Sequence, residues 1–262
     1  MFLKADWKNY LHGIRKQELD IVFSFLGSQR FSSALEVGAG DGYQTGLLAE
    51  RCGAFISTDL NFGRIKEELK VPKVLYKQCD ADKLEGVFEP EQFDLIFSSN
   101  LIEHLSDPSG FLFNTKTFLT SGGYGIHVVP GRLIKLSYLA LHYLNLFALV
   151  VDRFIGLFQK KEIFRGSRIY LENNLNLLRQ EKRGRLKKIL FPPIHGNFRS
   201  HQEEFVKFGK KEWEKLFREA GFDIKACLRG PVFSGYGFSF GPVSLLEKIG
   251  LASEHIFIIQ KN

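Results

Sequence analysis

The sequence predicts an α/β protein built on a buried parallel sheet, and three observations support this fold class. Short apolar runs, rich in β-branched and aromatic residues, alternate with helical patterns between residues 34 and 129. This alternation is typical of strand–helix–strand units. The chain has 262 residues, enough for one large domain, and its apolar and charged fractions of 44% and 25% are those of an ordinary globular protein.

The elements follow in order along the chain. Residues 6–26 predict an amphipathic helix, because their apolar side chains recur on one broad face. Five strands are expected at residues 34–37, 54–58, 74–77, 93–98 and 124–129. Residues 45–51 predict a helix, and another begins at Pro108 behind the N-cap Asp107 and ends at Gly122 and Gly123. A helix at 210–220 and strands at 222–227 and 255–260 complete the pattern.

The strand–helix pattern stops at Pro130 and resumes near residue 205. We therefore expect a core with an N-terminal helix at residues 1–130, a helical insertion at 131–204, and the C-terminal part of the core at 205–262. Three scattered cysteines, Cys52, Cys79 and Cys227, disfavour a disulfide scaffold and suit a reducing compartment. The first apolar run is too short for a secretory signal, so a cytoplasmic protein is expected.

A glycine-rich loop follows the first predicted strand. Gly38, Gly40 and Gly42 lie between that strand and a predicted helix, and glycine lets the backbone turn tightly and approach a ligand closely. A dinucleotide-binding loop would have glycine at position 43, where this chain has Tyr43, so the spacing argues against NAD. Asp59 ends the second strand, 19 residues after Gly40, where an acid can accept hydrogen bonds from both ribose hydroxyls.

Four segments resemble the class I S-adenosylmethionine-dependent methyltransferases. They are residues 36–42 (EVGAGDG), Asp59, residues 79–82 (CDAD) and residues 93–105 (FDLIFSSNLIEHL). The similarity is to the small-molecule branch that includes the ubiquinone-biosynthesis O-methyltransferases, and it covers residues 34–130 well, 205–260 loosely and 131–200 not at all. It implies a Rossmann-like, seven-stranded, mostly parallel sheet with an antiparallel last strand and helices on both faces. The helical insertion expected from the break in the pattern would then follow the fifth strand.

The resemblance also implies S-adenosylmethionine as the cofactor and assigns residues to its parts. The loop residues expected at the methionine part are Gly38, Ala39, Gly40, Asp41 and Gly42, and Glu36 would reach the amino group. Asp59 with Leu60 would hold the ribose, and Asp80 with Ala81 would bracket the adenine, with Asp82 as a second candidate acid. Ser98, Ser99 and Asn100 follow the fourth strand and would face the cofactor and the substrate opening.

Methyl transfer is an in-line displacement that needs an aligned donor and acceptor, and a hydroxyl acceptor also needs a base. The candidate bases are His195, His104 and His201, each with an alternative as a loop or structural histidine. In ubiquinone-type enzymes the segment containing Glu103 and His104 can carry a divalent metal through carboxylates. Asn100 stands at the position of the first carboxylate, and we expect no metal.

The predicted insertion has two unusual parts. Residues 136–151 carry no formal charge, and as a helix they would span about 24 Å, short of a comfortable membrane crossing. Residues 153–200 hold twelve Lys or Arg residues against three acidic ones, which more than accounts for the net charge of +7. Within them Leu171, Leu175, Leu178, Leu186, Ile189 and Leu190 form an apolar stripe. An apolar helix beside a basic amphipathic one fits an anionic membrane surface, contacted through residues 131–190, and a solvated lid is the alternative.

The sequence therefore favours a methyltransferase located in the cytoplasm and peripheral to the inner face of a membrane. Its acceptor would be small, amphiphilic or linked to a lipid or saccharide, and methylated at oxygen. The alternatives are a soluble small-molecule enzyme with a lid, an RNA methyltransferase, and a non-enzymatic binding protein. No nucleic acid is expected, because the basic residues accompany aliphatic runs rather than exposed aromatic side chains.

Overall fold

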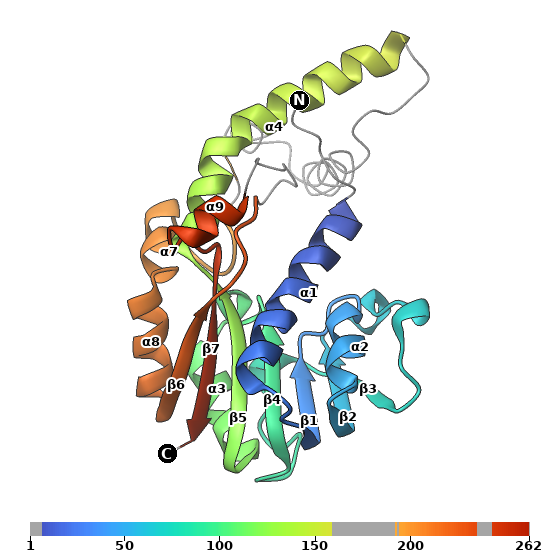
Figure 1. Cartoon of the computed structure of the whole chain (residues 1–262), viewed down its shortest axis with the longest axis vertical. Helices are drawn as coiled ribbons and strands as arrows, with labels where there is room; N and C mark the ends of the chain where they lie inside the picture. Colours follow the sequence, from blue (N-terminus) through green and yellow to red (C-terminus); the bar gives the residue numbers. More distant parts are fainter. Residues whose placement is uncertain (1–6, 159–191, 193, 235–242, 262) are drawn as a thin grey trace.

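The computed structural model describes residues 7–158, 192, 194–234 and 243–261. These residues form a seven-stranded sheet in the order β3-β2-β1-β4-β5-β7-β6 (Figure 1). Strand β7 runs antiparallel to both of its neighbours, and the other pairings are parallel. The expected Rossmann-like α/β fold, with a mostly parallel sheet and an antiparallel last strand, is confirmed.

The strands are β1 (Phe31–Val37), β2 (Cys52–Asp59), β3 (Val74–Gln78), β4 (Phe93–Ser99), β5 (Leu119–Pro130), β6 (Phe222–Arg229) and β7 (Glu254–Lys261). The α-helices are α1 (Trp7–Leu26), α2 (Tyr43–Ala49), α3 (Pro108–Phe118), α4 (Arg132–Phe158), α7 (His201–Lys207), α8 (Lys210–Glu219) and α9 (Val243–Lys248). Two short 3-10 helices matter for the site, η3 (Ala81–Lys83) and η4 (Ile102–His104). Every strand expected from the sequence is present, extended by one to five residues at its ends.

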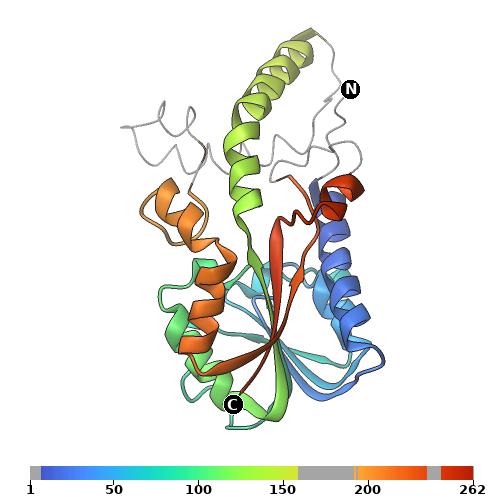
Figure 2. The ribbon, with the colours of Figure 1, turned by 60° about the vertical axis from the view of Figure 1, so that its left-hand side comes forward.

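Helices cover both faces of the sheet, as expected (Figure 2). On one face, Leu19 of α1 and Leu48 of α2 pack with the buried side chains of the strands. On the other face, Phe111 of α3 and Phe217 of α8 belong to a second apolar cluster. Burial of these two layers is the main source of stability for the fold, because it removes apolar surface from water on both sides of the sheet.

The predicted end of the helix after Pro108 is wrong. Helix α3 ends at Phe118, and Gly122 and Gly123 lie inside strand β5. The strand starts early because Leu119 already pairs with Phe93, and the ladder between β4 and β5 then shifts register. Gly122, with φ of +74°, accommodates the irregularity. Glycine near the end of a helical pattern therefore marks a strand bulge here.

The predicted insertion begins directly after β5 with helix α4, which extends beyond the end of the sheet (Figures 1 and 2). The expected boundary at residue 204 falls within α7. The apolar stripe expected between Leu171 and Leu190 lies outside the described residues. No helix in the described part of the chain is both long enough and apolar enough to cross a membrane.

Candidate active site

The glycine loop follows β1 at the carboxyl edge of the sheet. Gly38, Gly40 and Gly42 have φ of +83°, +60° and +90°, a left-handed conformation that other residues rarely adopt. The backbone N–H groups of Gly38 and Ala39 both donate to the carbonyl oxygen of Thr58 on β2, at 2.8 and 2.9 Å. These hydrogen bonds hold the loop against the end of the neighbouring strand.

Asp59, the last residue of β2, also fixes the loop. Its Oδ2 accepts a hydrogen bond from the backbone N–H of Gly40 at 2.8 Å, and its Oδ1 accepts one from Asn61 at 2.8 Å. Asp59 is only 6% exposed, whereas Leu60 beside it is 62% exposed. The loop and Asp59 meet where the strand order reverses between β1 and β4, and open α/β sheets bind ligands at such a switch point.

Glu36 lies on β1 just before the loop and is buried. Its Oε2 accepts hydrogen bonds from the hydroxyl groups of Thr45 and Ser57. Burial raises the pKa of Glu36 to about 7, and these two hydrogen bonds oppose the shift. Asp41 within the loop contacts His12 of α1 at 2.7 Å. Helix α1 therefore packs against the loop that the sequence assigns to the cofactor.

The acidic pair at 80 and 82 divides into two different environments. Asp80 precedes η3, and its Oδ1 accepts a hydrogen bond from the backbone N–H of Asp82. The carboxylate of Asp82 instead accepts hydrogen bonds from the backbone N–H groups of Ser106 and Asp107, at 2.9 to 3.1 Å. Ala81 between them is buried. Asp82 thus supports the segment that precedes α3, whereas the second carboxylate oxygen of Asp80, Oδ2, lies 3.4 Å from Nζ of the exposed Lys83.

The residues that end β4 point in different directions. The hydroxyl of Ser98 lies 2.8 Å from Nδ1 of His127, which is fully buried in the core, so Ser98 faces away from the edge. Asn100 follows the strand with φ of +48°, a strained position for a residue other than glycine. A Cβ placed on Gly38 would lie 3.1 Å from the Leu101 side chain. The segment after β4 is therefore in contact with the glycine loop.

Two of the three candidate bases are brought together around Glu103. His104 and His195 each place Nε2 at 3.8 Å from Oε1 of Glu103, and their rings are 4.8 Å apart. Glu103 is buried, and within the described part of the chain neither of its carboxylate oxygens has a hydrogen-bond partner. The backbone N–H of Asn197 donates to the Glu103 carbonyl, which holds the segment containing His195 in place. The sequence placed Glu103 and His104 in one segment, but it gave no sign that His195, 92 residues away, lies beside them.

This cluster of Glu103, His104 and His195 offers two kinds of chemistry. Burial lowers the pKa of His104, so its imidazole is neutral near pH 7 and can accept a proton. The three side chains also form the group of metal-type donors found among the described residues, with ligand atoms within 4.8 Å of one another. One carboxylate and two imidazoles suit a transition-metal ion such as zinc, although the sequence led us to expect no metal.

His201, the third candidate base, is engaged elsewhere. Its Nδ1 lies 2.7 Å from Nζ of Lys135, whose ammonium group is fully buried and pairs with Glu204. This contact joins α4 to α7. Burial and the adjacent Lys135 charge lower the pKa of His201. Its geometry is that of a residue linking two helices.

Sequence reasoning missed a partly buried polar network beneath α1. Arg15 donates through Nη1 to Glu18 at 2.5 Å and to the Ser99 hydroxyl at 3.0 Å. Asn100 donates through Nδ2 to Oε1 of Glu254, at the start of β7, at 2.8 Å. The available signal was the pair of charged residues Arg15 and Glu18 between apolar positions of the predicted helix. Glu254, which also contacts Arg15, is 236 residues from Glu18 in the chain, and no local sequence pattern connects the two acids.

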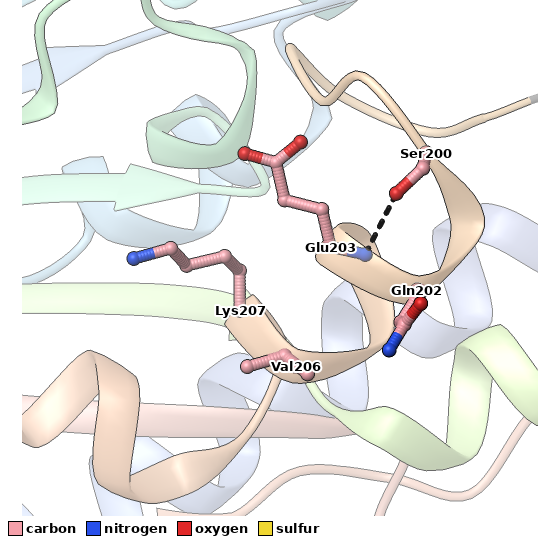
Figure 3. A pocket seen from close by; sticks show the side chains of 5 residues that line it. All are labelled: Ser200, Gln202, Glu203, Val206 and Lys207. Atoms are coloured by element: carbon pink, nitrogen blue, oxygen red, sulfur yellow. Dashed lines mark hydrogen bonds between the residues drawn. The ribbon is translucent and has the colours of Figure 1, made fainter.

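A surface hollow of about 320 Å³ lies on α7 (Figure 3). It is lined by Ser200, Gln202, Glu203, Val206 and Lys207. The Ser200 hydroxyl accepts a hydrogen bond from the backbone N–H of Glu203, as an N-cap does. None of the predicted site residues lines this hollow.

Comparison with known proteins agrees with the motifs. Residues 35–127 match the family model of a methyltransferase domain. A phosphoethanolamine N-methyltransferase from Triticum aestivum is 33% identical over 96 residues, which are 35% of this chain and 19% of that protein. A ubiquinone biosynthesis O-methyltransferase from Acinetobacter baylyi is 25% identical over 120 residues, 44% of this chain and 50% of that protein. The matches span no more than half the length of these two relatives.

The fold is shared with solved structures. An S-adenosylmethionine-dependent methyltransferase from Mesorhizobium loti superposes with a TM-score of 0.53 at 12% identity, covering 94% of this chain and 98% of that one. At this identity the similarity concerns the fold alone. The evidence for kinship is the family match, because the matched residues 35–127 include the glycine loop, Asp59 and the end of β4. The chain therefore carries a methyltransferase domain of the class I S-adenosylmethionine-dependent family.

Proposed function

We propose that this protein transfers a methyl group from S-adenosylmethionine to a small amphiphilic acceptor at the carboxyl edge of the sheet. The observation that carries the proposal is the contact between the glycine loop and the segment after β4, where Leu101 packs against Gly38. That segment continues into Glu103 and His104. Cofactor residues and candidate proton-accepting residues thus belong to one continuous part of the edge.

The proposed roles are those that the family resemblance implies for these positions. Glu36, Asp41 and the glycine loop would bind the methionine part, Asp59 the ribose, and Asp80 with Ala81 the adenine. When bound, S-adenosylmethionine supplies an electrophilic methyl group on a sulfonium. The imidazole of His104 or His195, supported by Glu103, would take the proton that the acceptor loses. The two curated relatives are named for a nitrogen and an oxygen acceptor, so similarity leaves the acceptor atom open.

We propose an amphiphilic acceptor because helix α4 exposes apolar side chains. Its exposed apolar stripe consists of Leu136, Ala140, Tyr143, Phe147 and Val150, spaced alternately by four and three residues. Phe147 is 69% exposed, and a stripe of this length on one helix face is an unusual solvated surface. Because residues 153–200 are strongly basic, we propose that α4 and this segment bind an anionic membrane surface.

Two experiments test the proposal. Methyl-labelled S-adenosylmethionine should transfer its label into a crude extract of lipids and metabolites, and the Asp59→Ala variant should not. In co-sedimentation with vesicles of anionic phospholipid at low salt, the wild type should pellet and Phe147→Glu should stay in the supernatant. Phe113→Glu on α3 is the matched control, because Phe113 is 68% exposed. Label that stays on the cofactor contradicts the methyltransferase assignment, and full-length protein left in the supernatant contradicts the membrane assignment.

A further inference from the structure

Three side chains with metal-ligating atoms meet at η4. Nε2 of His104 and Nε2 of His195 each lie 3.8 Å from Oε1 of Glu103, and the three ligand atoms are within 4.8 Å of one another. Around a tetrahedral zinc ion, with bonds of about 2.0–2.2 Å, neighbouring ligand atoms are about 3.3–3.6 Å apart. Small rotations of the two imidazoles would therefore bring all three atoms to coordinating distance.

The Glu103 carboxylate is the observation that points to an ion. Its side chain is fully buried, and among the residues that the structure describes neither of its oxygens accepts a hydrogen bond. Buried polar groups in folded proteins are nearly always paired, and a buried carboxylate without a donor is costly. A divalent cation that the two imidazoles also ligate would supply the missing partner.

The segment that carries His195 is held against η4 by contacts of its own. The backbone N–H of Asn197 donates to the Glu103 carbonyl at 2.8 Å. Gly196 has φ of +80°, and a Cβ placed there would lie 2.5 Å from the same carbonyl oxygen, so this close approach requires glycine. The His195 ring stacks on Tyr138 of α4, with ring centroids 6.0 Å apart. The fold thus positions the ligand atoms before an ion binds.

The imidazole side of the cluster is accessible to an ion from solvent. The side chains of His104 and His195 are 47% and 35% exposed. Three protein ligands leave the fourth position of a tetrahedral ion open, as in catalytic zinc sites. Leu101, two residues before Glu103, packs against Gly38. The site therefore follows directly on the segment that contacts the glycine loop.

The donor set also selects the class of ion. Magnesium and calcium prefer oxygen ligands, whereas two imidazole nitrogens and one carboxylate suit zinc and related transition metals such as cobalt. Asn100 does not belong to the cluster, because its side chain donates to Glu254. The expectation of no metal rested on ligand spacing along the chain, and His195 enters the cluster from a distant segment.

We propose that Glu103, His104 and His195 bind one divalent transition-metal ion of the zinc type at the carboxyl edge of the sheet. The proposal goes beyond the proposed function and does not depend on it, because ion binding is measured without cofactor or acceptor. The ion would change which group accepts a proton. Both Nε2 atoms would be ligands, and a water in the fourth position, made more acidic by the ion, would replace the free imidazole.

Titration with metal ions tests the site. The full chain is dialysed against a chelator and titrated calorimetrically with Zn²⁺ and, separately, with Mg²⁺, and Co²⁺ binding is followed by visible absorption. We expect one Zn²⁺ per chain, far weaker Mg²⁺ binding, and the intense visible bands of four-coordinate Co²⁺. His104→Ala and His195→Ala should each weaken Zn²⁺ binding at least about tenfold. His201→Ala is the matched control, six residues after His195 and outside the cluster.

Circular dichroism shows whether each variant is folded, and Glu103→Gln replaces any histidine variant that is not. Failure of the wild type to bind one Zn²⁺, or Mg²⁺ binding of equal strength, overturns the proposal. Wild-type Zn²⁺ affinity in the folded cluster variants also overturns it, as does an equal loss in His201→Ala. Binding of S-adenosylhomocysteine to the same samples tests the proposed function separately, so loss of the metal site alone leaves that function standing.

Discussion

Asp59 accepts a hydrogen bond from the backbone N–H of Gly40 at 2.8 Å, and this bond joins the end of β2 to the middle of the glycine loop. The same carboxylate is the group expected to hold the cofactor ribose. One side chain would therefore both shape the loop and bind the ligand, and its loss should affect affinity more than a single lost contact would.

Asp59→Ala should weaken S-adenosylhomocysteine binding by about 10- to 100-fold, because hydrogen bonds to charged groups contribute about 1.5–3 kcal/mol. Asp94→Ala is the control, since Asp94 caps the backbone of Ser32 and Ser33 at the other end of β1. Calorimetric titration should show near wild-type affinity for the control. Equal affinity in both variants would mean that Asp59 is not a cofactor ligand.

Glu36 should make stability depend on pH. Its pKa is about 7 in the folded protein and 4.5 ordinarily, so the folded state holds the proton more tightly. The free energy of unfolding should therefore fall as pH rises from about 4.5 to 7, by on the order of 3 kcal/mol. Urea unfolding at pH 5 and pH 7.5 measures this change. Glu36→Gln should remove most of it, and an unchanged pH dependence in this variant would refute the assignment.

Replacing Asp80 and replacing Asp82 should have different effects, the first on cofactor affinity and the second on stability. Asp82→Ala removes the acceptor for Ser106 and Asp107, and we expect a lower melting temperature with cofactor affinity close to wild type. Asp80→Ala should instead weaken cofactor binding. A paired thermal melt and calorimetric titration distinguishes the two, and a large affinity loss in Asp82→Ala would restore Asp82 as an adenine ligand.

Lys135 and Glu204 should be strongly coupled, because both are fully buried. Lys135→Met leaves the Glu204 carboxylate without its partner, which should lower the free energy of unfolding by about 3–5 kcal/mol. Lys135→Met combined with Glu204→Leu removes both charges and should recover most of that loss. Denaturant unfolding of the single and double variants measures the coupling, and additive effects would contradict it.

The sheet was predictable because its strands are short apolar runs bounded by turn residues. The run ending at Val37 leads directly into the glycine loop, and residues 93–98 lead into Asn100. The end of α3 was not predictable, because Gly122 reads equally well as a helix stop and as a bulge. Pairing of Leu119 with Phe93 decides between them, and that contact is tertiary.

The residues proposed to bind the cofactor lie in local motifs, and these motifs carry most of the predictable part of the site. The acids Glu103, Glu18 and Glu254 do not lie in such local motifs with their partners. Glu103 and His195 are 92 positions apart, and Glu18 and Glu254 come from the first helix and the last strand. Only the folded sheet brings them close to their partners, and no local pattern in the sequence connects them.

Calorimetric titration of the wild-type protein with S-adenosylhomocysteine tests the central claim most directly, with Gly40→Arg as its partner variant. Apart from Gly40 and its two chain neighbours, no atom of the described residues lies within 4 Å of a Cβ placed on Gly40, so the arginine would enter the open space that the cofactor is expected to fill. The account predicts one-site binding by wild type and none by Gly40→Arg, with both proteins folded. Absence of binding by wild type, or equal binding by both, would contradict it.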